Sequence, residues 1–322
     1  MDDTRFTETT APLRREILAH CYRMLGSAAD AEDATQETML RAWRGFGRFE
    51  GRSSARTWLH QIATNVCLRQ LKQRGRRALP SDLGQAEDDF HRPARAAPTG
   101  TRWLGPLPVD PADEAGANQR VRLAFVAALQ HLPASQRAVL LLRDVAELPA
   151  GEVATALGMT TIAVNSTLRR ARDRLARTGP DPEALREPGG AELRTRLSRY
   201  VDAFQRADVR ALAAVLREDV TLEMPPHATW FAGRDAVLGF LGAQVLREPG
   251  RFVMAPVPLV ANGQPTYAMY HREPGGDLAA HALQVLDVAA GGIRHIHIYL
   301  QPELFPIFGR PVILPAGADP HR

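Results

Sequence analysis

The chain has 322 residues, of which 45% are hydrophobic and 24% charged, so it is neither wholly disordered nor collagen-like and favours two or three globular domains. The net charge of +4 is unevenly divided: residues 1–180 hold 26 Lys and Arg against 20 Asp and Glu, whereas residues 181–322 hold 14 against 16. Two basic clusters in the first half, at 69–77 and 169–177, indicate either contact with a polyanion or solvated helix ends whose cations favour the helix dipole.

The first residues of the chain are acidic and polar, and no run of 18 uninterrupted apolar residues occurs anywhere. We therefore expect no secretory signal, no membrane span and no membrane partner. Cys21 and Cys67 are the only cysteines, too few for a disulfide scaffold, and they predict buried thiols in a protein of the reducing cytoplasm.

Residues 10–77 predict an all-α domain. Apolar residues recur at helical spacing over 13–25, and a glycine follows that run. A second helix has Asp30 as its expected cap, and Leu40 and Trp43 supply its apolar surface. A third helix begins at Ser53 or Ser54. Its polar face contains no acidic residue and carries His60, Gln61, Asn65 and Arg69.

Residues 78–116 are rich in proline and glycine and lack an apolar period, so they predict a linker. An apolar island inside it, Trp103, Leu104 and Leu107, predicts that part of this segment docks on another part of the protein.

Residues 117–178 predict a second all-α domain that ends in a helix-turn-helix. A short helix over 149–157 is followed by a glycine-containing turn at 158–159 and by a helix over 161–177, which Thr160 can cap. The outward side of the last helix offers amides, hydroxyls and guanidinium groups, which suit base edges in a major groove. An ordinary helical hairpin with a solvated polar face is the alternative.

A third unit at 191–308 follows a linker at 179–190 and precedes a tail at 309–322. Two helices, a strand, a further helix and strand-like runs at 251–261, 266–272, 278–288 and 293–300 predict an α+β cone. The predicted fold class is therefore multidomain, with two all-α domains and an α+β cystatin-like cone.

Two sets of motifs resemble a known family. DAEDATQET at 30–38, RAW at 41–43, FEG at 49–51, RTWL at 56–59 and IATN at 62–65 closely resemble region 2 of extracytoplasmic-function (group IV) RNA polymerase sigma factors. LP at 132–133, QRAVLLL at 136–142, EVA at 152–154, LG at 157–158, VNS at 164–166 and RAR at 170–172 resemble their region 4. Both sets stand in the right order, with a linker between them, and cover residues 12–177.

The resemblance implies a sigma factor that binds core RNA polymerase and promoter DNA. Residues implied in polymerase binding are Asp33, Gln36 and Glu37, although acids there also offset a helix dipole. Residues implied in minus-10 binding and melting are Phe49, Ser53, Trp58, Asn65, Arg69 and Lys72, with core packing as the alternative for Trp58. Residues implied in minus-35 reading are Thr161, Asn165, Ser166, Arg169, Arg170 and Arg172. Asn165 replaces the commoner Lys or Arg, and Asn suits adenine better than guanine.

The third unit resembles the SnoaL-like domain fused to some of these sigma factors. The resemblance rests on Tyr200, Phe204, MPP at 224–226 and GRDA at 233–236. Tyr200, Trp230, His281, His295 and His297 are the residues expected to line a pocket. His295 and His297 share one strand face and could hold a metal or act as a base, but no convincing carboxylate accompanies them, so polar lining or an exposed face is favoured.

These observations predict a bacterial alternative sigma factor whose third unit regulates it, either by binding a small-molecule ligand or by docking on the sigma regions or their linker. We expect no cofactor, no metal and no enzymatic activity. Two other classes stay open: a helix-turn-helix regulator that works without polymerase, and a small-molecule enzyme carried by the SnoaL-like unit.

Overall fold

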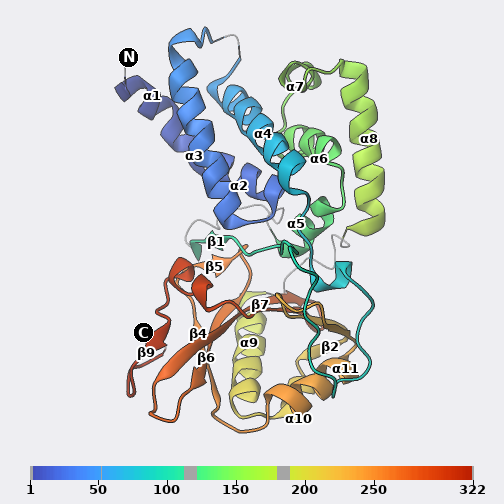
Figure 1. The fold of residues 1–322 in the computed structure, drawn as a ribbon, viewed down its shortest axis with the longest axis vertical. Coiled ribbons are helices and arrows are strands. Elements are labelled where there is room, and N and C mark those ends of the chain that lie inside the picture. The colour runs from blue at the N-terminus through green and yellow to red at the C-terminus, as the bar shows by residue number, and fades with distance from the viewer. Residues whose placement is uncertain (1–2, 52, 112–121, 180–188, 321–322) are drawn as a thin grey trace. The chain divides into compact units, whose positions relative to one another are not determined.

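The computed structural model describes residues 3–51, 53–111, 122–179 and 189–320 (Figure 1). The chain divides into two compact units. The first, called the sigma unit after the resemblance of its motifs, contains residues 1–77, 104–107 and 120–180, and the C-terminal unit contains residues 78–103, 108–119 and 181–322. No helix of the described residues is long and apolar enough to cross a membrane.

The first part of the sigma unit is a bundle of three long helices, α2 (Arg14–Leu25), α3 (Ala28–Gly45) and α4 (Ala55–Arg74), preceded by α1 (Asp3–Thr10). Ser54 caps α4 through its hydroxyl, which accepts from the Thr57 amide at 3.0 Å. Ser27 rather than the expected Asp30 caps α3, because Asp30 already lies in the first turn and its amide donates to the Ser27 hydroxyl. Cys21 and Cys67 are both fully buried.

The second part of the sigma unit contains α5 (Leu123–Gln130), α6 (Ala134–Leu140), α7 (Ala150–Leu157) and α8 (Thr161–Thr178), and a π-helical turn (Leu141–Val145) continues α6. Gly158 ends α7 with a left-handed φ of 63°, which glycine adopts at no steric cost. Thr160 caps α8 by accepting from the Ala163 amide at 3.1 Å. The predicted helix-turn-helix is therefore present.

The two parts of the sigma unit pack on each other through buried groups. The Arg137 guanidinium is 2% exposed and donates to the carbonyl of Met24 and, at 2.8 Å, to Oε1 of Gln130. The expected apolar island also docks here, because Leu104 and Leu107 are buried and the neighbouring Gly105 carbonyl accepts from the Tyr22 hydroxyl at 2.9 Å.

The C-terminal unit begins with α9 (Gly190–Gln205) and α10 (Val209–Ala213). Its main sheet contains β2 (Leu216–Glu223), β3 (Trp230–Ala232), β4 (Phe252–Pro256), β6 (Thr266–Arg272), β7 (Leu278–Ala289), β8 (Gly292–Tyr299) and β9 (Ile313–Leu314). The strand order is β3-β2-β8-β7-β6-β4 with β9 on β7, and β2 and β8 run parallel. A separate pair joins β1 (Pro108–Val109) to β5 (Val260–Ala261).

The sheet of this unit is covered on both faces. Helices α9, α10 and α11 (Arg234–Phe240, continued by a π-helical turn over Leu241–Val245) pack on one face around an apolar cluster that includes Phe204, Leu222 and Ile296. On the other face, the C-terminal segment places Phe305 edge-on against Tyr270, with ring centroids 5.1 Å apart. Side chains at alternate strand positions therefore enter two different interiors.

Candidate functional site

A hollow of about 430 Å³ opens on the first part of the sigma unit, between the end of α3 and the first half of α4. Four of the six residues predicted to contact the minus-10 element line it: Phe49, Ser53, Trp58 and Asn65. The remaining lining residues are Arg41, Gly45, Arg48, Glu50 and Ile62. Of these, Arg41 of the RAW motif is paired with Glu37, and Arg48 brings positive charge that the sequence motifs did not identify.

The wall of this hollow is aromatic. The rings of Phe49 and Trp58 stack with centroids 4.7 Å apart and planes 26° apart. Trp58 is half-buried, so the ring packs on one side and leaves surface in the hollow. Phe46 extends the cluster and is held in turn by Phe6 of α1, edge-on at 5.3 Å. The contact with α1 was not predicted, because one Phe in a polar segment carries no periodic signal.

Arg69 and Lys72 do not line the hollow and lie exposed farther along α4. Their spacing from Asn65, four and seven residues, keeps them on the same helix face. Two other members of the basic cluster share one acid, because Arg74 and Arg77 bind the two carboxylate oxygens of Asp30 at 3.1 and 2.5 Å. Arg69 and Lys72 continue the positive charge from the hollow along the face of α4 that carries Asn65.

The residues predicted to bind polymerase lie on one face of α3. Asp33 and Gln36 are exposed, and Glu37 accepts from Arg41 at 2.6 Å. Leu40 and Trp43, expected to supply apolar surface to the bundle, lie on this face with exposures of 50% and 40%. Periodicity placed them inside because it cannot distinguish an apolar face that packs on the bundle from one that remains uncovered.

The residues predicted to read the minus-35 element are exposed along α8. Thr161, Asn165, Ser166, Arg169 and Arg170 present hydroxyl, amide and guanidinium groups on the surface of the helix. Arg172 is exposed too, but its guanidinium forms a bidentate ion pair with Asp144 at 2.7 and 2.8 Å. The ion pair holds Arg172 against the preceding helical segment.

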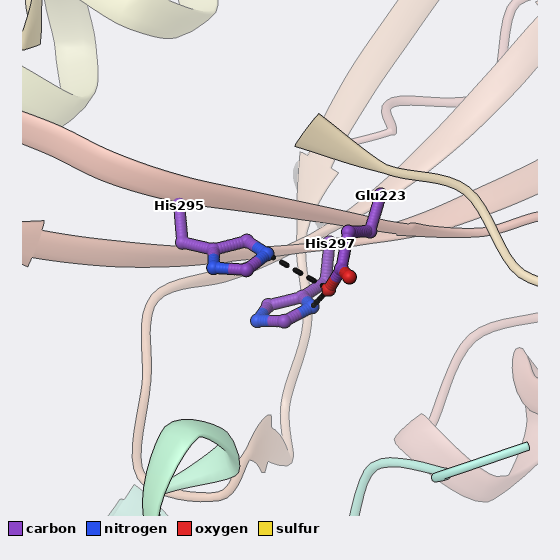
Figure 2. Close-up of side chains that lie close together, drawn as sticks. All are labelled: Glu223, His295 and His297. Carbon is purple, nitrogen blue, oxygen red and sulfur yellow. Dashed lines mark hydrogen bonds and ion pairs between the residues drawn. The ribbon is translucent and has the colours of Figure 1, made fainter. Parts of the chain in front are cut away.

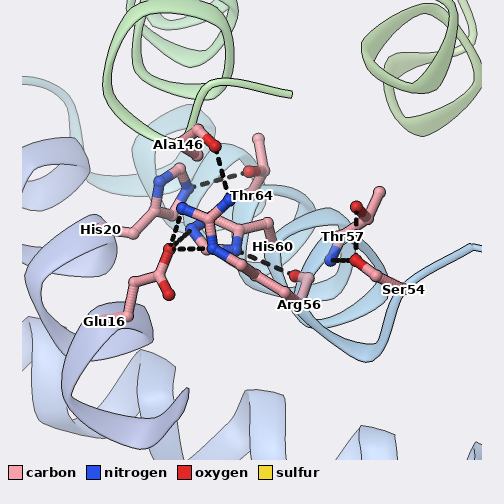
Figure 3. Close-up of polar contacts among 8 residues, drawn as sticks. All are labelled: Glu16, His20, Ser54, Arg56, Thr57, His60, Thr64 and Ala146. Atoms are coloured by element: carbon pink, nitrogen blue, oxygen red, sulfur yellow. Dashed lines mark hydrogen bonds and ion pairs between the residues drawn. The ribbon is translucent and has the colours of Figure 1, made fainter. Parts of the chain in front are cut away.

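A polar cluster joins α2 and α4 to the Ala146 carbonyl (Figure 3). Arg56 binds the Glu16 carboxylate at 2.6 Å and donates to the Ala146 carbonyl at 2.7 Å. His60, expected on the polar face of α4, is instead 2% exposed and lies 3.4 Å from the same carboxylate. Burial lowers the pKa of His60, although its hydrogen bond to the Arg56 carbonyl and the charge of Glu16 act to raise it. Burial, together with the neighbouring His60, lowers the pKa of His20 well below its ordinary value.

The five residues expected to line a pocket in the C-terminal unit do not share one face of the sheet: Trp230, His295 and His297 flank Glu223 on one face, and Tyr200 lies on the other. Tyr200 is fully buried and donates to Oε1 of Gln284 at 2.9 Å. Trp230 donates to the Gly84 carbonyl at 3.0 Å, and the ring of His281 lies 5.2 Å from that of Phe252. His295 and His297 lie on the sheet face opposite the helices. The common lining was therefore wrong, because alternation along the strands divides these side chains between two interiors.

His295 and His297 have the carboxylate partner that the sequence did not reveal (Figure 2). Oε2 of Glu223 lies 3.0 Å from Nε2 of His295 and 3.5 Å from Nδ1 of His297, since Glu223 of β2 is the register partner of His297 on β8. Burial acts to raise the pKa of the fully buried Glu223, but the hydrogen bond with His295 and the close approach of His297 outweigh it and hold that pKa well below its ordinary value.

Among the described residues, Glu223, His295 and His297 form a set with metal-ligand atoms within 4.8 Å of one another. The imidazole rings, however, stack with centroids 3.8 Å apart and planes 13° apart. Lone pairs in two nearly parallel planes cannot both point at one ion at the usual nitrogen distance of about 2.0–2.1 Å. The arrangement suits a buried hydrogen-bonded ion pair better than a metal centre.

The comparisons with known proteins agree with this division. Residues 11–77 match Sigma-70 region 2, residues 122–175 match Sigma-70, region 4, and residues 197–296 match the SnoaL-like domain. The ECF RNA polymerase sigma factor SigG of Mycobacterium tuberculosis H37Rv is 45% identical over 322 residues, covering 95% of this chain and 84% of that protein. The chain belongs to the ECF RNA polymerase sigma factors. It therefore directs transcription initiation, and the predicted family and fold class are confirmed.

Other relatives of this sigma factor have the same extent. A probable ECF sigma factor SigI of Mycobacterium tuberculosis H37Rv is 28% identical over 294 residues, covering 90% of this sigma factor and 91% of that protein. The crystal structure of the ECF sigma factor SigJ of Mycobacterium tuberculosis superposes with a TM-score of 0.58 over 94% of this sigma factor and 98% of that chain, at 22% identity. The two share a fold.

The linker of this sigma factor is ordered over residues 78–103 and forms part of the C-terminal unit. The Glu87 amide donates to the Trp230 carbonyl at 2.8 Å, and the Arg95 amide donates to the Thr229 hydroxyl at 2.7 Å. The Phe90 ring packs directly against Gly239, so closely that a Cβ on this glycine would lie 2.8 Å from the ring. The proline and glycine content of this segment therefore reflects an irregular but packed path.

Proposed function

We propose that the hollow on the first part of the sigma unit captures an unpaired base of the minus-10 element. The observation that carries this proposal is that Phe49, Ser53, Trp58 and Asn65 line one hollow of about 430 Å³. Taking a base out of the duplex costs a few kcal/mol, and stacking on an aromatic side chain returns about 1–3 kcal/mol. The aromatic wall supplies stacking and the Asn65 amide supplies hydrogen bonds to a base edge.

The remaining surfaces of the sigma unit have complementary roles in this proposal. Arg69 and Lys72 contact backbone phosphates next to the captured base and add affinity without sequence information. The exposed side of α8 enters the major groove at the minus-35 element, where Asn165 favours adenine. The face of α3 with Asp33, Gln36 and Glu37 binds core RNA polymerase, and the exposed Leu40 and Trp43 add apolar contact to it.

We also infer that the C-terminal unit regulates the sigma factor rather than catalysing a reaction. Its candidate pocket residues do not converge, and the interior between its helices and sheet is occupied by large side chains such as Tyr200 and Phe204. The same unit holds the linker that joins the two sigma regions. This sigma factor acts in the cytoplasm, together with the polymerase.

Run-off transcription with core polymerase on a cognate promoter tests the proposed function. Asn65→Ala should lower output roughly 5- to 100-fold, since it removes a base-edge contact from the hollow. Gln73→Ala is the matched control, because it removes an exposed amide from the same helix outside the hollow. Equal effects of the two variants would contradict the proposed base capture, and binding of duplex promoter without polymerase would favour a helix-turn-helix regulator instead.

A further inference from the structure

The linker segment 78–103 is closed into a loop on the C-terminal unit. The Ala78 amide donates to the Arg102 carbonyl at 2.8 Å, and Ala78 pairs with Trp103 as a parallel bridge. The two ends of a stretch of about 26 residues are therefore held together. Extended, the same stretch could span roughly 85–95 Å, at about 3.3–3.6 Å for each residue. Closing the loop removes that length from the connection between regions 2 and 4.

A buried carboxylate meets the linker near the start of this loop. Oε1 of Glu223 accepts from the backbone amide of Ser81 at 2.9 Å, while Oε2 faces the two histidines. Glu223 is fully buried, and Leu79 and Pro80 of the linker are buried beside Ser81 in the chain. A carboxylate removed from water is costly unless each oxygen is hydrogen-bonded, so the Ser81 amide and His295 both stabilise it.

The groups around this carboxylate fix its direction. On β7, Asp287 is the register partner of His295 and is bound to Arg294 at 2.7 Å, so that acid is already paired. On β8, the Tyr299 ring lies 6.4 Å from that of His297. With one carboxylate oxygen occupied by the histidines, the other is directed at the linker. The stacked imidazoles thus position Glu223 for the Ser81 amide.

We propose that Glu223, positioned by His295 and His297, anchors the start of the linker loop on the C-terminal unit through Ser81, beside the contacts of Glu87, Phe90 and Arg95, and that breaking this anchor loosens the linker. The inference rests on the proposed regulatory role of that unit and names the contact through which it acts. A freed linker gives regions 2 and 4 a longer tether, and so favours the separated arrangement needed to engage two promoter elements at once.

Hydrogen exchange of the full-length protein tests the anchor directly. Glu223→Gln keeps the shape of the side chain but removes its charge, and Glu223→Ala removes both acceptor oxygens. Exchange of peptides within 78–95 should become roughly 5- to 100-fold faster in Glu223→Ala and less so in Glu223→Gln, as expected for a lost hydrogen bond to a buried charged group. Trypsin should cut sooner at Arg92, which is exposed in the loop.

Glu273→Gln is the matched control. Glu273 also pairs with a histidine, His271 of β6 at 3.3 Å, but Glu273 itself is exposed and lies in the β6–β7 turn of the same unit. Its substitution should leave linker exchange unchanged. Exchange of peptides from β7 and β8 shows whether a variant remains folded. If Glu223→Ala does not fold, linker exchange in Glu223→Gln tests the anchor instead.

Linker peptides that exchange faster while β7 and β8 stay protected support the anchor. Unchanged linker exchange in a folded Glu223 variant would overturn it. Run-off transcription by the same variants separates the anchor from the regulatory role: we expect output to rise at least twofold. A freed linker with unaltered output would leave the anchor standing and refute regulation through the linker.

Discussion

Replacing Trp58 by alanine tests whether the aromatic wall acts on an unpaired base or only supports the bundle. The ring of Trp58 stacks on Phe49 at 4.7 Å and also lies against Phe46 at 6.4 Å. An aromatic pair contributes about 0.5–1.5 kcal/mol beyond its buried area, and the half-buried ring also covers apolar surface, so Trp58→Ala should lower the free energy of unfolding by about 1–3 kcal/mol. Loss of a base stack should cost a further 1–3 kcal/mol or so in promoter opening.

The two contributions separate in a comparison of templates. Polymerase reconstituted with the variant is assayed on a duplex promoter and on one whose minus-10 segment is already unpaired. On the duplex, roughly 5- to 150-fold lower output is expected, because about 1.4 kcal/mol corresponds to tenfold. The preopened template should recover much of that loss, since the cost of unpairing no longer depends on the hollow.

Trp58→Phe is the conservative control, since it keeps a ring that can stack on Phe49 and on a base. It should retain most of the duplex output that Trp58→Ala loses. A Phe49→Ala, Trp58→Ala double-mutant cycle measures how far the two rings act as one surface. If Trp58→Ala lost stability yet opened the duplex promoter normally, Trp58 would be a core residue and the proposed stacking role would be refuted.

The buried histidines and the α8 ion pair give two further predictions. Burial lowers the pKa of His20 and His60 in the folded state, so these histidines take up protons in the unfolded chain first as pH falls below about 6.5. The free energy of unfolding should therefore decline by up to about 1.4 kcal/mol per pH unit for each of the two histidines. Denaturant titrations at several pH values should show that His60→Gln flattens this decline, whereas substitution of the exposed His91 by Gln does not. An unchanged dependence of the unfolding free energy on pH in His60→Gln would contradict the role of the buried histidine. Asp144→Ala releases Arg172, so the affinity of the reconstituted polymerase holoenzyme for promoter duplex should rise and its salt dependence steepen by about one phosphate contact, whereas an unchanged salt slope would leave Arg172 without a role in binding.

The sigma half of the fold was predictable because its signals are local. Helical spacing of apolar residues and a following glycine determine α2, α4, α7 and α8 within a few residues, and Ser54 and Thr160 also mark the starts of α4 and α8. The same reasoning failed for Leu40 and Trp43, which are apolar yet exposed on α3. In sequence, an exposed apolar helix face has the same residue spacing as a face that packs in the core. Only the packed structure shows which face is uncovered.

Glu223 shows where local reasoning ends. Along β2, Val220, Leu222 and Met224 enter the interior beneath the helices, so alternation assigns Glu223 to the opposite, polar side. That side is buried as well, because Ser81, 142 positions earlier, covers it, and because the parallel pairing of β2 with β8 brings two histidines beside it. A segment that covers a strand from so far away in the sequence does not change the apolar periodicity of that strand. The carboxylate and its contact with the linker are therefore a consequence of tertiary structure, because the sequence of β2, LREDVTLE, does not distinguish Glu223 from the exposed acids Glu218 and Asp219 of the same strand.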